Sequence, residues 1–234
     1  MVCISLNVYE LVYSLQARMK WILCLRTHCN ENHFQIIAFF ISLMAKQIQP
    51  ESLPLNNYNK SDNMANDSVT LGGKPQQLRG TVLQPGIKAP EFTFVTEKLE
   101  EKSSYELGHK ALVIIAVPSL DTGVCAKETR RFNELLSAKE GAIGLTMSMD
   151  LPFAMKRFCE LEGIKNLIAG SDFRYREFGE AFNADIIDGA FKGLIARVVF
   201  VIDADNVVRY TELVPEIGQE PDYDKVLAAV DGIL

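Results

Sequence analysis

One cysteine stands at the junction between an apolar run and a segment with helical spacing. The run ALVIIAV at 111–117 predicts a buried strand, and the stretch PSLDTGVC at 118–125 leads from it into the helix. Cys125 therefore falls in the first turn of that helix, where backbone N–H groups are unpaired and the helix dipole is positive. Both features stabilise the thiolate, which is the nucleophilic form. This position is suited to redox or nucleophilic chemistry.

The residues Thr122-Gly123-Val124-Cys125 occupy the place where thioredoxin-type oxidoreductases carry a C-x-x-C pair. Thr122 puts a hydroxyl where the first thiol would stand, which opposes a disulfide isomerase or a general reductase. The hydroxyl can accept a hydrogen bond from a peroxide O–H and donate one to the sulfur or the reacting oxygen. Pro118 limits the backbone and shields the sulfur, which protects a thiolate from over-oxidation. The motif favours attack on a peroxide.

The composition bounds the class of protein. The chain has 234 residues, 48% apolar and 23% charged, as expected of one globular domain plus an additional segment. A formal net charge of −6 argues against nucleic acid or an anionic membrane as a partner. Five cysteines are too few and too uneven for a disulfide-stapled secreted fold, so we expect a cytoplasmic protein with free or catalytic thiols. No cofactor or metal is expected, because the nearest grouping, Cys24, His28 and Cys29, lacks the four ligands of structural zinc.

Residues 1–63 differ in character from the rest of the chain. Their longest uncharged apolar run, at 34–45, has twelve residues, whereas a helix that crosses a bilayer needs about twenty. An amphipathic arm that associates with a membrane is one interpretation. We favour an N-terminal extension, disordered or outside the functional protein, with Met64 as the functional start. The polar stretch at 47–67 is then a linker to the domain at 64–234.

From residue 64 onward, strands alternate with helices and are followed by a hairpin and a last helix. Strands are predicted at 68–71, 77–81, 92–95, 111–117, 142–149, 197–203 and 207–213. Helices are predicted at 124–138, 151–162 with Asp150 as N-cap, 175–182 and 221–233. Gly72-Gly73-Lys74-Pro75 predicts the turn of an N-terminal hairpin. The order predicts an α/β thioredoxin-like fold, a central mixed sheet flanked by helices, with an N-terminal β-hairpin.

Four segments carry a resemblance to a known family. They are VPSLDTGVC at 117–125 with RFN at 131–133, LPFAMKRFC at 151–159, DGAFKGLIARVVFVID at 188–203 and EPDYDKVL at 220–227. Together they resemble the peroxiredoxins, and most closely the bacterial thiol peroxidases, which are atypical two-cysteine peroxiredoxins. The likeness covers about 64–234. It implies a peroxidase that reduces hydrogen peroxide and organic hydroperoxides in antioxidant defence, is recycled by thioredoxin and forms a homodimer.

The resemblance also implies roles for single residues. Cys125 matches the peroxidatic cysteine, which attacks the terminal peroxide oxygen and becomes a sulfenic acid. Thr122 and Pro118 match the threonine and proline of the motif. Arg197 matches the family arginine, whose fixed charge favours the thiolate and stabilises charge on the leaving oxygen. Cys159 matches the resolving cysteine, and the resulting Cys125–Cys159 disulfide is reduced by thioredoxin through thiol exchange.

The geometry of a disulfide adds a constraint of its own. Cys125 and Cys159 fall on different predicted helices, and a disulfide needs Cα atoms within about 7 Å of each other. If a substrate pocket separates the two thiols, one or both helix ends must unwind before the bond forms. Gly123 and Gly163, at the ends of these helices, are compatible with such fraying. We expect local unfolding that depends on the redox state.

Two other functions share parts of this pattern. A peroxide-sensing relay, which passes its oxidation to a partner protein, has the same first step as the peroxidase. It differs in turning over poorly with thioredoxin and in forming a mixed disulfide with a specific target. A non-catalytic thioredoxin-like binding module is opposed by the presence of Thr122, Cys125 and Arg197 together.

Overall fold

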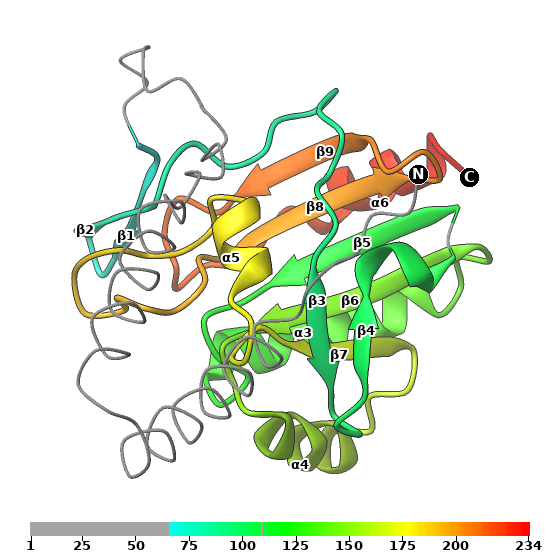
Figure 1. Ribbon diagram of the computed structural model, residues 1–234, viewed down its shortest axis with the longest axis horizontal. Helices are drawn as coiled ribbons and strands as arrows, with labels where there is room; N and C mark the ends of the chain where they lie inside the picture. The colour runs from blue at the N-terminus through cyan, green and yellow to red at the C-terminus, as the bar shows by residue number, and fades with distance from the viewer. Residues whose placement is uncertain (1–65, 109) are drawn as a thin grey trace, which may run out of the picture. The chain divides into compact units, whose positions relative to one another are not determined.

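The computed structural model of the protein describes residues 66–108 and 110–234. The expected extension at 1–63 and the proposed start at Met64 lie outside the described residues. The described part contains a seven-stranded sheet with helices on both faces and a separate two-stranded hairpin (Figure 1). Within this part of the chain, no helix has the length and apolarity needed to cross a membrane.

The sheet is mixed, as predicted. Its strands are β3 (Thr93–Thr96), β4 (Glu101–Ser103), β5 (Ala111–Ala116), β6 (Ala142–Ser148), β7 (Leu167–Ser171), β8 (Val198–Asp203) and β9 (Val208–Leu213). Their spatial order is β4-β3-β7-β6-β5-β8-β9. The central strands β5, β6 and β7 are parallel, and the outer strands pair antiparallel. The predicted thioredoxin-like layout is confirmed.

The helices lie on two faces of this sheet. They are the 3-10 helix η1 (Ser104–Leu107) and the α-helices α3 (Gly123–Leu136), α4 (Pro152–Glu162), α5 (Glu177–Ala181) and α6 (Tyr223–Asp231). All six residues of β5 are buried, and its side chains alternate between the faces. Val113 packs in one apolar cluster with Phe132 of α3, and Ile114 packs in another with Phe178 of α5. The continuous apolar run of β5 is explained by this burial on both sides.

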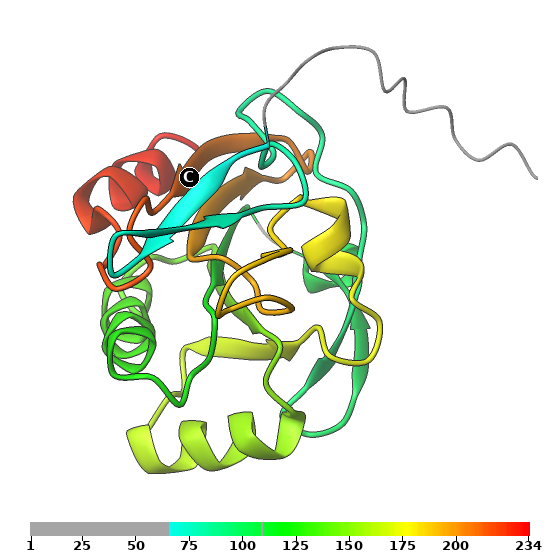
Figure 2. The same cartoon turned by 90° about the vertical axis from the view of Figure 1, so that its left-hand side faces the viewer.

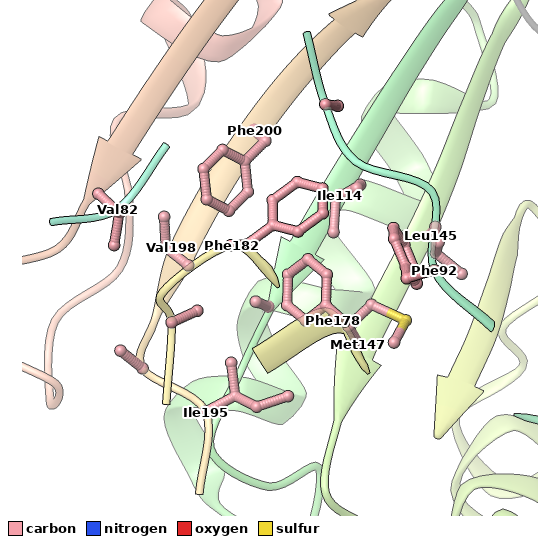
Figure 3. Packing of buried hydrophobic residues seen from close by; sticks show 14 of the residues in the cluster. Val82, Phe92, Ile114, Leu145, Met147, Phe178, Phe182, Ile195, Val198 and Phe200 are labelled. Atoms are coloured by element: carbon pink, nitrogen blue, oxygen red, sulfur yellow. The ribbon is translucent and has the colours of Figure 1, made fainter. Parts of the chain in front are cut away.

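The α5 face is filled by aromatic side chains (Figure 3). The ring of Phe178 on α5 lies 4.7 Å from the ring of Phe182, centroid to centroid, and Phe182 lies 5.1 Å from Phe200 of β8. Burying each of these side chains contributes about 1.5–3 kcal/mol. This packing fixes the short helix α5, whose own length is too small for it to be stable alone.

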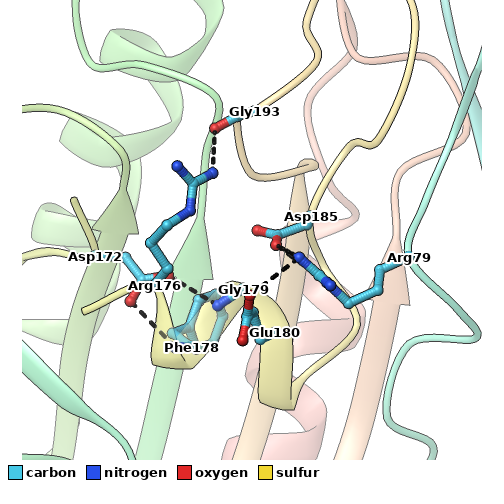
Figure 4. Close-up of polar contacts among 8 residues, drawn as sticks. All are labelled: Arg79, Asp172, Arg176, Phe178, Gly179, Glu180, Asp185 and Gly193. Atoms are coloured by element: carbon cyan, nitrogen blue, oxygen red, sulfur yellow. Dashed lines mark hydrogen bonds and ion pairs between the residues drawn. The ribbon is translucent and has the colours of Figure 1, made fainter. Parts of the chain in front are cut away.

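Buried carboxylates fix the chain around α5 as well (Figure 4). Asp172 accepts hydrogen bonds from the N–H groups of Phe178 and Gly179, at 3.1 and 2.8 Å. Burial, opposed by these hydrogen bonds, raises the pKa of Asp172 to about 6. Asp185 is paired with Arg79 at 2.8 Å, which ties the loop after α5 to the chain that follows the hairpin.

The N-terminal hairpin consists of β1 (Ser68–Leu71) and β2 (Lys74–Gln77). Its turn is formed by Gly72 and Gly73 alone, with φ angles of 59° and 77°. Two consecutive residues with positive φ make a two-residue primed turn, for which glycine is suited because it has no Cβ. Val69 of β1 is buried in the α5-side cluster, so the hairpin covers part of that face.

The predicted second hairpin strand at 77–81 is wrong. Because the two glycines complete the turn, the strand begins at Lys74 and includes Pro75, which was predicted as part of the turn. Pro75 is tolerated because β2 pairs with β1 on one side only. The chain leaves the hairpin at Leu78, which forms an isolated bridge with Ile186.

The other predicted elements are confirmed to within two residues at each end. Three elements, β4, β7 and η1, were not predicted. Asp150 is not the N-cap of α4: Leu151 holds that position without a side-chain hydrogen bond. Pro152 begins the helix, and a proline there has no N–H that needs a capping partner. The Asp150 carboxylate is occupied elsewhere, as described below.

Candidate active site around Cys125

Cys125 lies where the sequence predicts, in the first turn of α3. It is the third residue of the helix, after Gly123 and Val124, and 1% of it is exposed to solvent. The first turn of α3 contains no acidic residue. The positive end of the helix dipole therefore acts on the sulfur without a competing carboxylate in that turn.

Arg197 approaches the sulfur from the sheet. It immediately precedes β8, and alternation along the strand puts it on the same face as Val199, which belongs to the cluster that contains Cys125. Arg197 is 1% exposed, and its Nη2 donates to the Sγ of Cys125 at 3.1 Å. Two predicted site residues that are 72 positions apart in the sequence are thus in direct contact.

Glu128 also binds Arg197, and the sequence analysis missed it. Its Oε2 accepts from Nη1 of Arg197, and the side chain has no exposed surface. Its other oxygen, Oε1, has no hydrogen-bond partner among the described residues. A signal was available in the sequence: Glu128 falls on the stripe of α3 that buries Cys125, Thr129 and Phe132. A glutamate on a buried stripe requires a cationic partner.

The charges of this pair depend on burial. Burial, opposed by the nearby Arg197, raises the pKa of Glu128 to about 7. Burial alone would lower the pKa of Arg197, but the facing Glu128 and Cys125 offset this, and the pKa is raised overall. The guanidinium remains positively charged, whereas Glu128 changes its charge near neutral pH.

Thr122 and Pro118 lie in the loop between β5 and α3. Thr122 is the N-cap residue of α3, but its side chain makes no capping hydrogen bond. Its hydroxyl instead donates to the carbonyl oxygen of Ser119 at 3.0 Å. The hydroxyl oxygen can still accept a hydrogen bond from another molecule. Pro118 is buried at the end of the central strand.

Asp150 holds this loop in place from the end of β6. Its Oδ2 accepts from the N–H of Leu120 at 2.7 Å, and its Oδ1 accepts from the hydroxyl of Ser119 at 2.8 Å. The hydroxyl of Ser148 donates to the same carboxylate at 2.8 Å. Asp150 therefore fixes the backbone that leads into the first turn of α3, a role that the prediction of an N-cap missed.

Cys159 lies in the last turns of α4 and is half-buried. It packs against the same apolar cluster that contains Cys125, and both thiols are free. Burial, with help from Glu97 and Glu160, raises the pKa of Cys159 to about 11. At neutral pH this thiol is therefore protonated in the folded helix. Gly163 ends the helix in the left-handed conformation, with φ at 66°.

An open cleft of about 260 Å³ lies between the beginning of α3 and α4. Its lining includes Thr122 on one side and Arg157, Phe158 and Leu161 on the other. Cys125 is not among the lining residues, in agreement with its burial. The cleft thus reaches the helical turn that carries the sulfur, while the sulfur itself is covered.

Metal ligation has no support in the described part of the chain, where no group of three or more His, Cys, Asp or Glu side chains has a suitable arrangement. Cys24, His28 and Cys29 lie outside the described residues. What the described residues bring together is a buried cysteine, a fixed cation and a helix N-terminus. This combination favours a nucleophilic sulfur and stabilises negative charge that develops beside it.

Comparisons with known proteins identify the family. Residues 84–227 match the family model described as Redoxin. The chain is 48% identical over 168 residues to a thiol peroxidase of Leptospira interrogans, which covers 71% of this chain and 98% of the relative. It is 47% identical over 167 residues to a thiol peroxidase of Aquifex aeolicus, with 71% and 98% covered.

The solved structures agree with the sequence relatives. The crystal structure of a peroxiredoxin-like protein from Aquifex aeolicus superposes with a TM-score of 0.68 at 47% identity, covering 71% of this chain and 97% of that one. The match extends over nearly the whole length of that protein and over most of the residues described here. This chain therefore belongs to the Redoxin family, among its thiol peroxidases.

Proposed function

We propose that this protein reduces hydrogen peroxide and organic hydroperoxides through Cys125 and Cys159 and is recycled by thioredoxin. The observation that carries the proposal is the 3.1 Å contact between the Arg197 guanidinium and the buried Sγ of Cys125 at a helix N-terminus. A cation beside the sulfur supports this role, because it would stabilise the negative charge that develops during O–O cleavage. The names of the relatives, thiol peroxidases, support the same reaction.

In the first step, the Cys125 thiolate attacks the terminal oxygen of the hydroperoxide. An S–O bond forms while the O–O bond breaks, so the sulfur is oxidised by two electrons to a sulfenic acid. The leaving oxygen takes up a proton and departs as water or an alcohol. Arg197 stabilises the charge on that oxygen, and the Thr122 hydroxyl, next to the cleft, orients the peroxide.

In the second step, Cys159 attacks the sulfenic sulfur of Cys125. The S–S bond forms as the S–O bond of the sulfenic acid breaks, and the hydroxide that leaves is protonated to water. The thiol must first lose its proton, which the raised pKa of Cys159 opposes as long as the helix is folded. Unwinding the end of α4 exposes the thiol to water and removes the desolvation that raises its pKa. We therefore retain the proposal of local unfolding that depends on the redox state.

The contacts that hold the end of α4 are compatible with this movement. Arg130 of α3 and Glu162 of α4 form an ion pair at 2.8 Å, and both side chains are partly exposed. An ion pair of this kind contributes only about 0–1 kcal/mol. Gly163 already adopts the left-handed conformation at the helix end, so the turn opens without strain at that residue.

In the third step, the dithiol of thioredoxin reduces the Cys125–Cys159 disulfide by thiol exchange and is itself oxidised to a disulfide. Phe153 and Leu161 on α4 are 66% and 77% exposed. These side chains offer an apolar contact surface beside Cys159, either for the reductant or for the second copy in a homodimer, which we also propose. Analytical ultracentrifugation of the reduced and oxidised protein tests the dimer.

The decisive experiment is NADPH oxidation coupled through thioredoxin reductase and thioredoxin, with wild type, Cys125→Ser and Cys159→Ser. We expect peroxide-dependent turnover for wild type alone, and one equivalent of peroxide consumed by Cys159→Ser. Activity that survives in Cys125→Ser would move the nucleophile elsewhere. Full turnover in Cys159→Ser would remove its resolving role. If wild type is oxidised by peroxide but is not reduced by thioredoxin, the relay function replaces the peroxidase.

A further inference from the structure

The guanidinium of Arg197 is held from two directions. Two of its contacts, with Cys125 and Glu128, are to side chains of α3. The third runs from Nε to the main-chain carbonyl of Ile217, at 3.0 Å, in the segment after β9. A guanidinium is planar, so fixing the direction of Nε–H fixes the plane in which both Nη atoms lie. The carbonyl of Ile217 therefore sets how Nη2 faces the sulfur.

The peptide of Ile217 is in turn held by the N-terminal hairpin. Its N–H donates to the carbonyl of Thr70 in β1 at 2.8 Å, and the N–H of Thr70 donates to the carbonyl of Pro215 at 2.7 Å. Figure 2 shows the cyan hairpin beside the end of the orange strands β8 and β9. The side chain of Ile217 is 3% exposed and packs in the α5-side cluster. The hairpin and the segment after β9 thus form one unit next to Arg197.

Glu216 connects the two parts of this unit. One of its oxygens accepts from the N–H of Gly72 at 3.0 Å and of Gly218 at 3.3 Å, and the other accepts from the hydroxyl of Thr70 at 2.8 Å and the N–H of Gly73 at 3.2 Å. These hydrogen bonds hold the pKa of Glu216 at about 2, so it is charged under all working conditions. A single carboxylate therefore binds the hairpin turn and the N–H of Gly218, which belongs to the same peptide group as the carbonyl of Ile217.

We propose that Glu216 is a positioning residue for the Cys125 site, which acts through the carbonyl of Ile217 on the guanidinium of Arg197. The contacts form a continuous path: the hairpin turn, Glu216, Ile217, Arg197 and the sulfur of Cys125. This proposal rests on the proposed roles of Cys125 and Arg197 and adds to them a residue that does not touch the sulfur. Without Glu216, the Ile217 carbonyl loses its fixed direction and Nη2 turns away from the sulfur.

If Glu216 only anchored the hairpin, its loss would have the same effect as the loss of another hairpin anchor. The chain offers such a matched control. Asp188 also fixes the hairpin with a carboxylate, because its Oδ1 accepts from the N–H of Gln77 at 2.6 Å. Asp188 lies in the loop after α5 and has no contact with Arg197. Removing either carboxylate loosens the hairpin, but only the loss of Glu216 frees the Ile217 carbonyl.

The test compares Glu216→Ala, Glu216→Gln and Asp188→Ala in the full chain. The pH profile of Cys125 alkylation by iodoacetamide is followed by peptide mass spectrometry in a Cys159→Ser background. The rate of Cys125 oxidation by hydrogen peroxide is measured in the same proteins by stopped flow. The melting temperature is recorded for each variant, so that a loss of stability is separated from a change at the sulfur.

We expect Glu216→Ala to move the midpoint of the alkylation profile to higher pH and to slow the peroxide reaction roughly tenfold or more, as misplacement of a stabilising group does. Glu216→Gln keeps one acceptor oxygen, so its midpoint and rate should lie between those of Glu216→Ala and those of the parent protein. It serves as the test if Glu216→Ala does not fold. Asp188→Ala should match its parent. An unchanged profile and rate in the Glu216 variants overturns the proposal, as does an equal change in Asp188→Ala.

These outcomes are distinct from a failure of the proposed function. If the parent protein does not react with peroxide, the peroxidase proposal fails. The alkylation profile then still decides whether Glu216 acts on the environment of Cys125.

Discussion

The carboxylate of Glu128 and the sulfur of Cys125 bind the same guanidinium, that of Arg197. The two side chains are three residues apart on α3, so they lie on one face of the helix and reach one cation. Two acidic groups therefore share a single buried positive charge. How much of that charge acts on the sulfur depends on whether Glu128 carries a proton.

The first prediction concerns the cation itself. Arg197→Lys keeps a positive charge but cannot contact Cys125, Glu128 and Ile217 at the same time. We expect the rate of Cys125 oxidation by peroxide to fall about 10²-fold, as when one donor that stabilises a developing charge is lost. Stopped-flow fluorescence or competition with a reference peroxidase measures this rate. Arg130→Lys, at a partly exposed position on α3, is the control, and an equal effect there would contradict the prediction.

The second prediction concerns the charge of Glu128. Glu128→Gln keeps an oxygen that accepts from Arg197 and removes the negative charge. More of the positive field then acts on the sulfur, so the midpoint of the alkylation profile of Cys125 should move to lower pH. Glu134→Gln removes an exposed acid of the same helix and should leave the profile unchanged. A shift to higher pH in Glu128→Gln would show that its charge is needed to place Arg197.

The third prediction concerns stability and pH. The pKa of Glu128 is raised from 4.5 to about 7 on folding, so between these values the folded state holds a proton that the unfolded state has lost. The contribution of this proton to the free energy of unfolding is complete below pH 4.5 and is lost as the pH rises through 7. In Glu128→Gln, the free energy of unfolding should therefore fall less between these pH values than in wild type. Urea unfolding at pH 5 and pH 8 measures it, and equal slopes in the two proteins would refute it.

A fourth prediction applies the same linkage to Asp172. Its pKa is raised from 3.8 to about 6, so its contribution to stability is complete below pH 3.8 and is lost as the pH rises through 6. Asp172→Asn should flatten the pH dependence of unfolding in that window. Because Asp172 lies on the α5 side of the sheet, the alkylation profile of Cys125 should stay at its wild-type midpoint. A shift of that midpoint would show that the two faces are coupled.

The fifth prediction concerns the loop before α3. Asp150→Ala leaves the N–H of Leu120 and the hydroxyls of Ser119 and Ser148 without their acceptor, and a buried group left unpaired costs about 1–3 kcal/mol. Denaturant unfolding should show this loss, and the peroxide reaction should slow because the first turn of α3 is less well held. Asp121→Ala, at an exposed position in the same loop, should change stability by less than about 0.5 kcal/mol. A similar loss in both variants would assign the effect to charge rather than to these hydrogen bonds.

Local patterns in the sequence predicted the position of the proposed nucleophile and most of the fold. The apolar run of β5 and the helical spacing after it placed Cys125 in the first turn of α3, because strand burial and the helix period act over a few residues. The same reasoning found four helices and the hairpin of β8 and β9. It failed where local rules compete: the two glycines of the first hairpin shortened its turn, and Leu151, followed by Pro152, is the N-cap of α4 in place of Asp150.

The roles of Arg197 and Cys159 came from the resemblance of whole segments to a family, since no local rule joins either residue to Cys125. Glu128 was not predicted, although it falls on the buried stripe of α3, because nothing near it along the chain identifies its partner, a cation 69 residues away. Only the pairing of β8 with β5, which brings Arg197 under the first turn of α3, decided this. The charge on Glu128 and the fixed direction of the Arg197 guanidinium are properties of burial and of contacts between distant segments. They arise only when the sheet is assembled, because desolvation and hydrogen-bond geometry do not exist in the extended chain.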